Sequence, residues 1–155
     1  MFQGSKIKIK KKRQTSHPAF NEIQMSCTRE LLTKGFETEV YLLVGGVGVK
    51  LLKDNHPSLA KIAHLPIIEF DFDYPGEPPL EHLAFFSLQG LRFSQSSLQN
   101  FAQLEQFTLT KLHLDGINAT DFNSLSIHQL EELSLRKTQV KSLDFLDSAP
   151  IQNLY

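Results

Sequence analysis

The chain has 155 residues, of which 41% are hydrophobic and 21% charged, and its formal net charge at pH 7 is −1. These values are close to globular averages and exclude a wholly disordered chain, and the small net charge excludes a protein whose whole surface attracts nucleic acid. No apolar run reaches the roughly 18 residues of a membrane-spanning helix. A single cysteine excludes an internal disulfide framework and a four-cysteine zinc site.

Residues 1–15 form a basic segment that contains Lys6, Lys8, Lys10, Lys11, Lys12 and Arg13. A secretory signal would continue into an apolar core, but Ser16, His17 and Pro18 follow instead, so we expect a cytoplasmic protein. The segment is typical of a flexible, solvated terminus. Contact with an anionic surface or with nucleic acid, and a localisation signal, are the alternatives.

Residues 16–45 predict a helix followed by a strand, which together cap the region that begins at residue 46. Ser16 or His17 is suited to begin the helix, with Pro18 in its first turn and Gly35 at its end. The apolar side chains of one helix face are Phe20, Ile23, Cys27 and Leu31. The alternating residues that predict the strand are Phe36, Thr38, Val40, Leu42 and Val44. We expect Cys27 to be a buried small hydrophobe.

From residue 46 onward, apolar residues recur every 21 residues without a gap. The copies begin at residues 46, 67, 88, 109, 130 and 151. Positions 1, 4, 6, 14 and 17 of these copies hold 26 apolar residues among 27, the exception being Gly46. A random phase would give roughly eleven. This array, over residues 46–155, comprises five full repeats and a truncated sixth, which suggests a fragment of a longer protein.

The positions of these residues predict the shape of each repeat. Positions 3 to 7 suit a short strand whose positions 4 and 6 point inward, while positions 14 and 17 return on the opposite side. A single coil cannot cover its own apolar face, so neighbouring coils must stack. A set of amphipathic helices is the alternative, but the spacing of positions 1, 4 and 6 and the phenylalanines at position 6 disfavour it.

The pattern resembles the leucine-rich repeat family in its short 21-residue form, LxxLxLxxTxVxxLxxL, most closely at Leu130, Leu133, Leu135, Thr138 and Val140. The resemblance implies an α/β-type repeat solenoid, a right-handed coil with short parallel strands on its concave face and little helix. Such arrays are common in bacterial proteins, sometimes beside a serine/threonine kinase domain. Position 9 departs from the pattern in most copies, which read Asp54, Pro75, Ser96 and Ile117.

The motifs that carry chemistry are weak. The glycines between Val44 and Lys50 match neither GxxxxGK[ST] nor GxGxxG, so we read them as the entry into the first coil. Glu69, Asp71 and Asp73 share one strand face, where a solvated charge ladder offset by Arg92 and Lys111, a protein-contact patch and a metal or acid/base site are the alternatives. The histidines show neither HxxxH nor HxH spacing. We therefore expect no enzyme activity, metal or cofactor.

The favoured function is a non-catalytic scaffold that binds a protein or peptide partner on the concave face. The residues expected to contact it are Lys50, Glu69, Asp71, Asp73, Tyr74, Arg92, Lys111, His113, Asp115, Glu132 and Arg136. Charge reversal at Asp71 and Asp73 is expected to weaken binding without unfolding the chain. Nucleic acid and membranes are not expected partners, apart from contact of the basic N-terminus with an anionic surface. The alternative is a structural piece of a larger repeat protein, such as a receptor or kinase-linked protein, that self-associates through its C-terminal edge.

Overall fold

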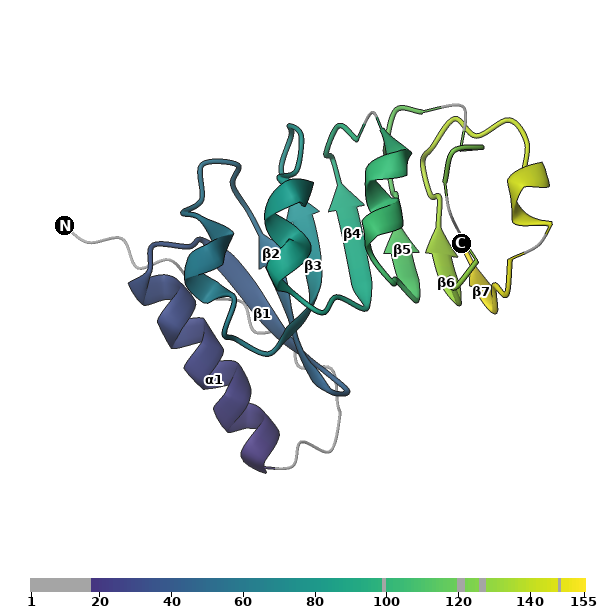
Figure 1. The fold of residues 1–155 in the computed structure, drawn as a ribbon. Coiled ribbons are helices and arrows are strands. Elements are labelled where there is room, and N and C mark those ends of the chain that lie inside the picture. The colour runs from purple at the N-terminus through teal and green to yellow at the C-terminus, as the bar shows by residue number, and fades with distance from the viewer. Residues whose placement is uncertain (1–17, 99, 120–121, 126–127, 148) are drawn as a thin grey trace.

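The computed structural model describes residues 18–98, 100–119, 122–125, 128–147 and 149–155, with no side chains for 18–20. The basic segment 1–15 and the suggested helix caps Ser16 and His17 lie outside these ranges, as does the side chain of Phe20. The described strands form one seven-stranded sheet in chain order, β1 to β7 (Figure 1). Among the described helices, none is long and apolar enough to cross a membrane.

The sheet is antiparallel at its first edge and parallel thereafter. β1 (Thr38–Leu43) runs antiparallel to β2 (Gly46–Leu51), and each later pair is parallel. The later strands are β3 (Ile67–Asp73), β4 (Gly90–Ser94), β5 (Lys111–His113), β6 (Glu132–Ser134) and β7 (Asn153–Leu154).

The predicted register is confirmed and a strand is present in each copy, although β5 and β6 end at repeat position 5 rather than 7. The position-4 residues pair as neighbours from strand to strand, in the order Val49, Phe70, Leu91, Leu112, Leu133 and Leu154. Each step along this row is 21 residues in sequence. The sequence repeat is therefore the spacing between neighbouring strands of the sheet.

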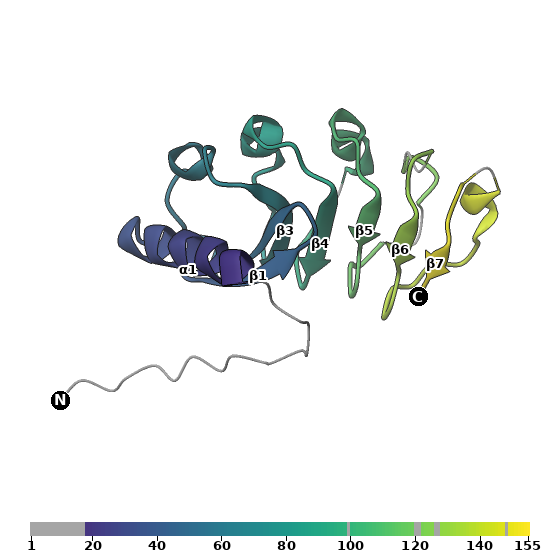
Figure 2. The same cartoon turned by 90° about the horizontal axis from the view of Figure 1, so that it is seen from below.

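Short 3₁₀ segments lie on one side of the sheet (Figure 2). They are η1 (Leu59–Ile62), η2 (Leu80–Phe85), η3 (Phe101–Gln106) and η4 (Asp144–Leu146). The first three begin at repeat position 14, and this residue and position 17 are buried against the strands in the first four copies. In the fifth copy Leu143 is 46% exposed, so the prediction of burial is wrong there.

Stacked phenylalanines connect successive coils through the core. The Phe72 and Phe93 ring centroids lie 5.7 Å apart, and those of Phe101 and Phe122 lie 5.0 Å apart. Each of these pairs joins equivalent repeat positions, so the rings form rows along the stacking direction. Apolar burial of this kind is the main favourable term in folding, and the described buried residues form one continuous cluster.

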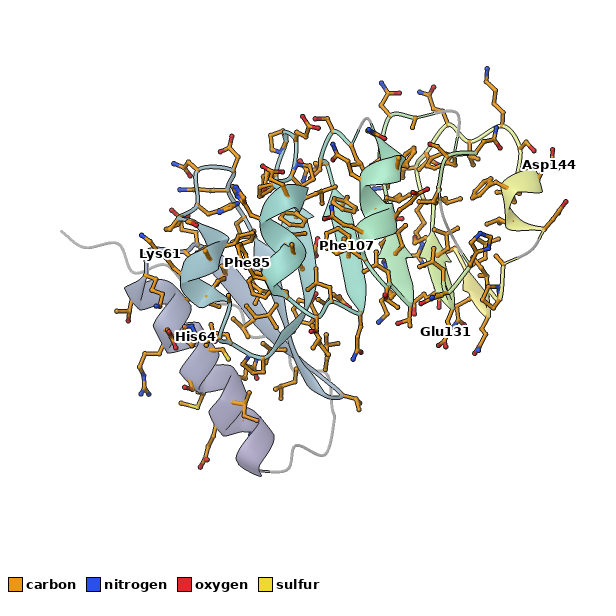
Figure 3. The ribbon with its side chains drawn as sticks, in the orientation of Figure 1. Lys61, His64, Phe85, Phe107, Glu131 and Asp144 are labelled. Carbon is orange, nitrogen blue, oxygen red and sulfur yellow. The ribbon has the colours of Figure 1, made fainter. Side chains whose placement is uncertain are left out.

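The helix and the strand predicted in residues 16–45 are present at the first edge of the sheet. α1 (Pro18–Thr33) is followed by Gly35 with φ +86°, and it buries Cys27 and Leu31 in the core cluster. Burial raises the pKa of the Cys27 thiol. Ile23 does not belong to the buried face, because its side chain is 41% exposed. His64, which follows η1, lies within 2.6 Å of Glu30 on α1 and joins the cap to the first coil (Figure 3).

The glycine-rich segment forms the turn between β1 and β2 and the first residues of β2. Gly45 has φ +94° in the turn between β1 and β2, and the strand ends at Leu43, so Val44 is 95% exposed rather than part of the strand. A Cβ on Gly46 would lie 2.5 Å from the Pro66 carbonyl oxygen. This close backbone approach explains why the one exception to the apolar pattern is a glycine.

Side chains at repeat position 9 connect to backbone carbonyls. The Ser96 hydroxyl lies 3.1 Å from the carbonyl oxygens of both Phe72 and Tyr74 in the preceding coil. The Thr138 hydroxyl donates instead to the Leu135 carbonyl of its own coil at 2.7 Å. Ser96 is buried, so its hydrogen bond links two coils inside the core.

Candidate functional site

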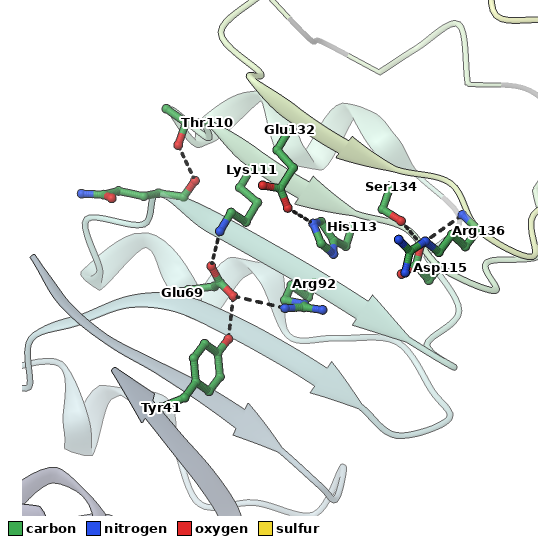
Figure 4. A network of polar contacts seen from close by, with 11 residues as sticks. Tyr41, Glu69, Arg92, Thr110, Lys111, His113, Asp115, Glu132, Ser134 and Arg136 are labelled. Atoms are coloured by element: carbon green, nitrogen blue, oxygen red, sulfur yellow. Dashed lines mark hydrogen bonds and ion pairs between the residues drawn. The ribbon is translucent and has the colours of Figure 1, made fainter. Parts of the chain in front are cut away.

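Strand alternation places the charged side chains of the parallel strands on the sheet face opposite the 3₁₀ segments, which we call the open face. The polar contacts across it are drawn in Figure 4. This face brings together the predicted site residues Lys50, Glu69, Asp71, Asp73, Arg92, Lys111, His113, Asp115, Glu132 and Arg136.

Tyr74 is the exception among the predicted site residues. It follows the end of β3, is only 3% exposed, and packs edge-on against Phe72 with ring centroids 6.0 Å apart. Burial raises the pKa of its hydroxyl to about 12. The prediction that Tyr74 lies on the partner-binding face is therefore wrong, because this side chain continues the inward alternation of Phe70 and Phe72 along β3.

The centre of the open face is a network around Glu69 of β3. Tyr41 of β1 donates a hydrogen bond from its hydroxyl to Glu69 Oε1 at 2.6 Å. Arg92 Nη1 of β4 lies 4.0 Å from the same oxygen, and Lys111 Nζ of β5 lies 3.7 Å from Oε2 (Figure 4). Side chains from strands on both sides of β3 thus converge on one carboxylate.

Two glycines at repeat position 3 make this network fit. A Cβ on Gly48 would lie 2.1 Å from the Tyr41 ring, and a Cβ on Gly90 would lie 2.7 Å from Glu69 Oε2. The ring of Tyr41 therefore covers Gly48, and the Glu69 side chain lies over Gly90. Because Gly90 carries no side chain, Lys111 reaches across β4 to a carboxylate on β3.

The carboxylates of β3 are not a solvated ladder. Glu69 is 3% exposed and Asp71 is 8% exposed, which corrects that interpretation. Burial raises the pKa of the Asp71 carboxyl to about 6, although the charges of Arg92 and Lys50 act in the opposite direction. Burial and the Glu69 carboxylate raise the pKa of Tyr41 far above its ordinary range, so its hydroxyl remains a donor.

Burial of Asp71 also changes what mutation of this residue would do. Its Oδ1 atom has no hydrogen-bond partner among the described residues. A lysine introduced here would place a new charge in a nearly closed site and would destabilise the fold. The expectation that reversal at Asp71 and Asp73 leaves the chain folded therefore does not suit Asp71.

Other charged side chains of the open face contact residues of neighbouring strands, and Lys50 with Asp73 forms a pair of opposite charges, as expected. Lys50 Nζ lies 2.8 Å from Asp73 Oδ2, and this bond raises the pKa of Lys50. His113 Nε2 lies 2.5 Å from Glu132 Oε1. Asp115 Oδ1 accepts hydrogen bonds from the Ser134 hydroxyl and, at 3.0 Å, from the backbone N–H of Arg136.

Three residues of this network were not anticipated as site residues, namely Tyr41, Gly48 and Gly90. The available signal was the pair of glycines at repeat position 3, on either side of the Glu69 copy. The two glycines leave a space on each side of Glu69, and another side chain is needed to fill such a space. The tyrosine that fills part of it comes from the cap, outside the repeat register.

The open face holds no arrangement of metal ligands among the described residues, since no group of three or more His, Cys, Asp or Glu side chains is placed to hold an ion. A pocket of about 180 Å³ lies away from this face. It is lined by apolar and polar residues of η3 and the following segments, the polar ones being Glu105, Thr108, His128 and Gln129. The open face is thus the surface on which the structure gathers the predicted site residues.

Comparison of the chain with protein-family models, with curated proteins and with solved structures gave no match in any of the three.

Proposed function

We propose that this chain is a leucine-rich-repeat solenoid that acts as a non-catalytic interaction scaffold, with the open face as its concave, partner-binding surface. The observation that carries the proposal is the division of side chains within each strand. Repeat positions 4 and 6 are buried from β2 to β6, while positions 3, 5 and 7 bring charged side chains to the open face at 21-residue intervals. A broad polar surface on a packed sheet suits a folded protein or a peptide.

The order of this surface also supports binding rather than solvation alone. Glu69 is bonded to Tyr41, Asp73 to Lys50 and Glu132 to His113, so these side chains are fixed before a partner arrives. Side chains that are already ordered lose less conformational entropy when a partner binds.

Site-specific photo-cross-linking tests the proposal. A benzophenone amino acid is introduced at Ser94, on β4 of the open face, and at Gln103, an exposed residue of η3 on the opposite side. In extracts of cells that naturally make the chain, we expect a saturable cross-linked partner from the Ser94 position and none from Gln103. Cross-links from Gln103 alone, or from neither position, contradict the proposal.

A second candidate is a structural role through association of the other edge of the sheet. β7 is an edge strand, and Leu154 and Tyr155 are 46% and 50% exposed. Exposed strand edges pair with further strands. Sedimentation velocity over a range of concentrations tests this candidate. Growth in mass that Leu154→Glu abolishes supports it, and a constant monomer mass contradicts it.

A further inference from the structure

The charged groups of the open face differ in how completely their hydrogen-bonding capacity is used. The accessible acids are engaged at short distance, Asp73 by Lys50 at 2.8 Å and Glu132 by His113 at 2.5 Å. The two central cations, Arg92 and Lys111, have no contact of that kind among the described residues.

Arg92 and Lys111 share one buried carboxylate at long range. Their nearest contacts with Glu69 are 4.0 and 3.7 Å, while the short contact of that carboxylate, at 2.6 Å, is with Tyr41. In the described part of the chain, Arg92 Nε has no hydrogen-bond partner. A guanidinium and an ammonium each carry several N–H donors, and the only ion pairs of these two groups within the described ranges are the long ones to Glu69.

Both cations are accessible from outside. The Arg92 and Lys111 side chains are 38% and 33% exposed, whereas the Glu69 side chain beneath them is 4% exposed. A ligand that approaches the centre of the open face therefore meets the two cations before it meets the acid (Figure 4).

We propose, building on the proposed function, that the centre of the open face binds an Asp or Glu side chain of a protein partner, whose carboxylate lies between Arg92 and Lys111. Hydrogen bonds between such cations and a carboxylate are about twice as strong as neutral ones. The convergence of both cations on Glu69 brings them close enough to contact one ligand group.

The buried acids favour a carboxylate over a phosphate group. Glu69 contacts both cations, Asp71 pairs across the strands with Arg92, and both acids are less than a tenth exposed. The charges of the two cations already face those of Glu69 and Asp71, so a carboxylate with one negative charge meets less repulsion from these acids than a phosphate with about two charges. Tyr41, the aromatic residue of the network, donates its hydrogen bond to Glu69. It is therefore not offered as a platform on which the bases of a nucleic acid would stack.

The test selects short random peptides, displayed on phage, against the whole chain, and maps each winner with the benzophenone variants at Ser94 and Gln103. We expect peptides that cross-link at Ser94 to carry an Asp or Glu at a fixed position. Replacing that acid by Gln or Asn in the synthetic peptide should weaken binding about tenfold or more. Only the mapping step uses variants, and the affinities of the two peptides are compared on the unaltered protein.

Substitutions of the two cations in the protein test the same contact as substitution of the acid in the peptide. Arg92→Gln with Lys111→Gln should weaken the acidic peptide about tenfold or more, and Arg92→Lys should have a smaller effect because it keeps the charge but loses the planar fork. Arg29→Gln on the exposed side of α1 is the matched control and should leave binding unchanged.

The outcomes separate this inference from the proposed function. Peptides that map to the open face without requiring an acid overturn the carboxylate site and leave the scaffold function standing. Inorganic phosphate that displaces the acidic peptide more strongly than N-acetylglutamate does, at equal ionic strength, overturns the choice of carboxylate. Peptides that map only to Gln103 count against both proposals.

Discussion

The two ends of the sheet have the same repeat pattern and differ in burial. At repeat positions 14 and 4, the first copy has Leu59 and Val49, both 0% exposed, while the last copies have Leu143 and Leu154, both 46% exposed. α1 and β1 cover the first end, and β7 is the last strand of the described sheet. The pattern therefore fixes where strands form, and burial depends on having a neighbour on each side.

Strand length follows the same gradient. β2 and β3 have 6 and 7 residues, whereas β6 and β7 have 3 and 2. Each residue of a central strand gains from packing and hydrogen bonds on both sides, and a residue near an uncovered edge gains less. We expect the covered half to account for most of the free energy of unfolding.

The most direct test of the difference in burial is the same substitution at the same repeat position in both halves of the sheet. Leu59→Ala should lower the free energy of unfolding by about 2–5 kcal/mol, because the residue is fully buried. Leu143→Ala should cost about 0.5 kcal/mol, because the side chain is already half exposed. Urea denaturation measures both values, and equal losses would show that the two ends are equally packed.

Asp71 provides a pH test of the covered half. Its pKa is raised from 3.8 to about 6 in the folded chain, so the folded state binds more protons than the unfolded state between these pH values. The free energy of unfolding contributed by this group therefore falls as pH rises from about 4 to about 6, by on the order of 3 kcal/mol.

Comparison with Asp71→Asn isolates this contribution, because other carboxyls titrate in the same range. The stability of the unaltered chain relative to the variant should decline through that pH window and then level off. Paired urea titrations at several pH values measure it. A difference that is constant with pH would show that Asp71 is not desolvated as described.

Gly48 gives a test of the contact between the cap and the first coil. Gly48→Ala places a Cβ 2.1 Å from the Tyr41 ring and should cost about 1–3 kcal/mol as the ring is displaced. In a Tyr41→Ala background the same change should cost much less, because the obstructing ring is gone. A cost that is identical in both backgrounds would assign the effect to the strand itself.

The smallest expected loss of stability is at repeat position 9, where Ser96 bonds to the preceding repeat. Ser96→Ala removes a buried hydroxyl that bonds to the preceding coil and should cost about 1 kcal/mol. Ser97→Ala, at an exposed neighbouring position, is the matched control and should be neutral within about 0.5 kcal/mol. Thermal unfolding of the two variants side by side resolves the difference, and equal midpoints would contradict a role for Ser96 in joining coils.

Much of the fold was predictable because it follows from a period. Leu112 and Leu133 pair as neighbours since a fixed repeat places equivalent residues on adjacent strands. The helix at the first edge of the sheet was predictable from the proline in its first turn and the glycine after it. The exposure of Leu143 was not, because the pattern describes a coil with a neighbour on each side and does not record which coils have one.

The sequence predicted which residues share the open face, but it did not predict which of them are buried or how they contact one another. Alternation alone placed Arg92 and His113 on one face, and cross-strand pairing followed. The burial of Glu69 depends on Tyr41, a residue outside the repeat that meets it only through the antiparallel pairing of β1 with β2. A contact between Tyr41, which lies outside the 21-residue repeat, and Glu69, which lies within it, cannot be read from the repeat pattern.

The fit of Tyr41 over Gly48 limits how this array can be shortened. Deleting one whole unit, residues 67–87, keeps every apolar row intact and brings β4 next to β2. Gly90 would then stand where Glu69 stood, and the Tyr41 hydroxyl would face a second glycine with no acceptor. A repeat can therefore be removed without loss of this contact only where Tyr41 does not touch it. A shortened chain should be designed by deleting repeats after β4.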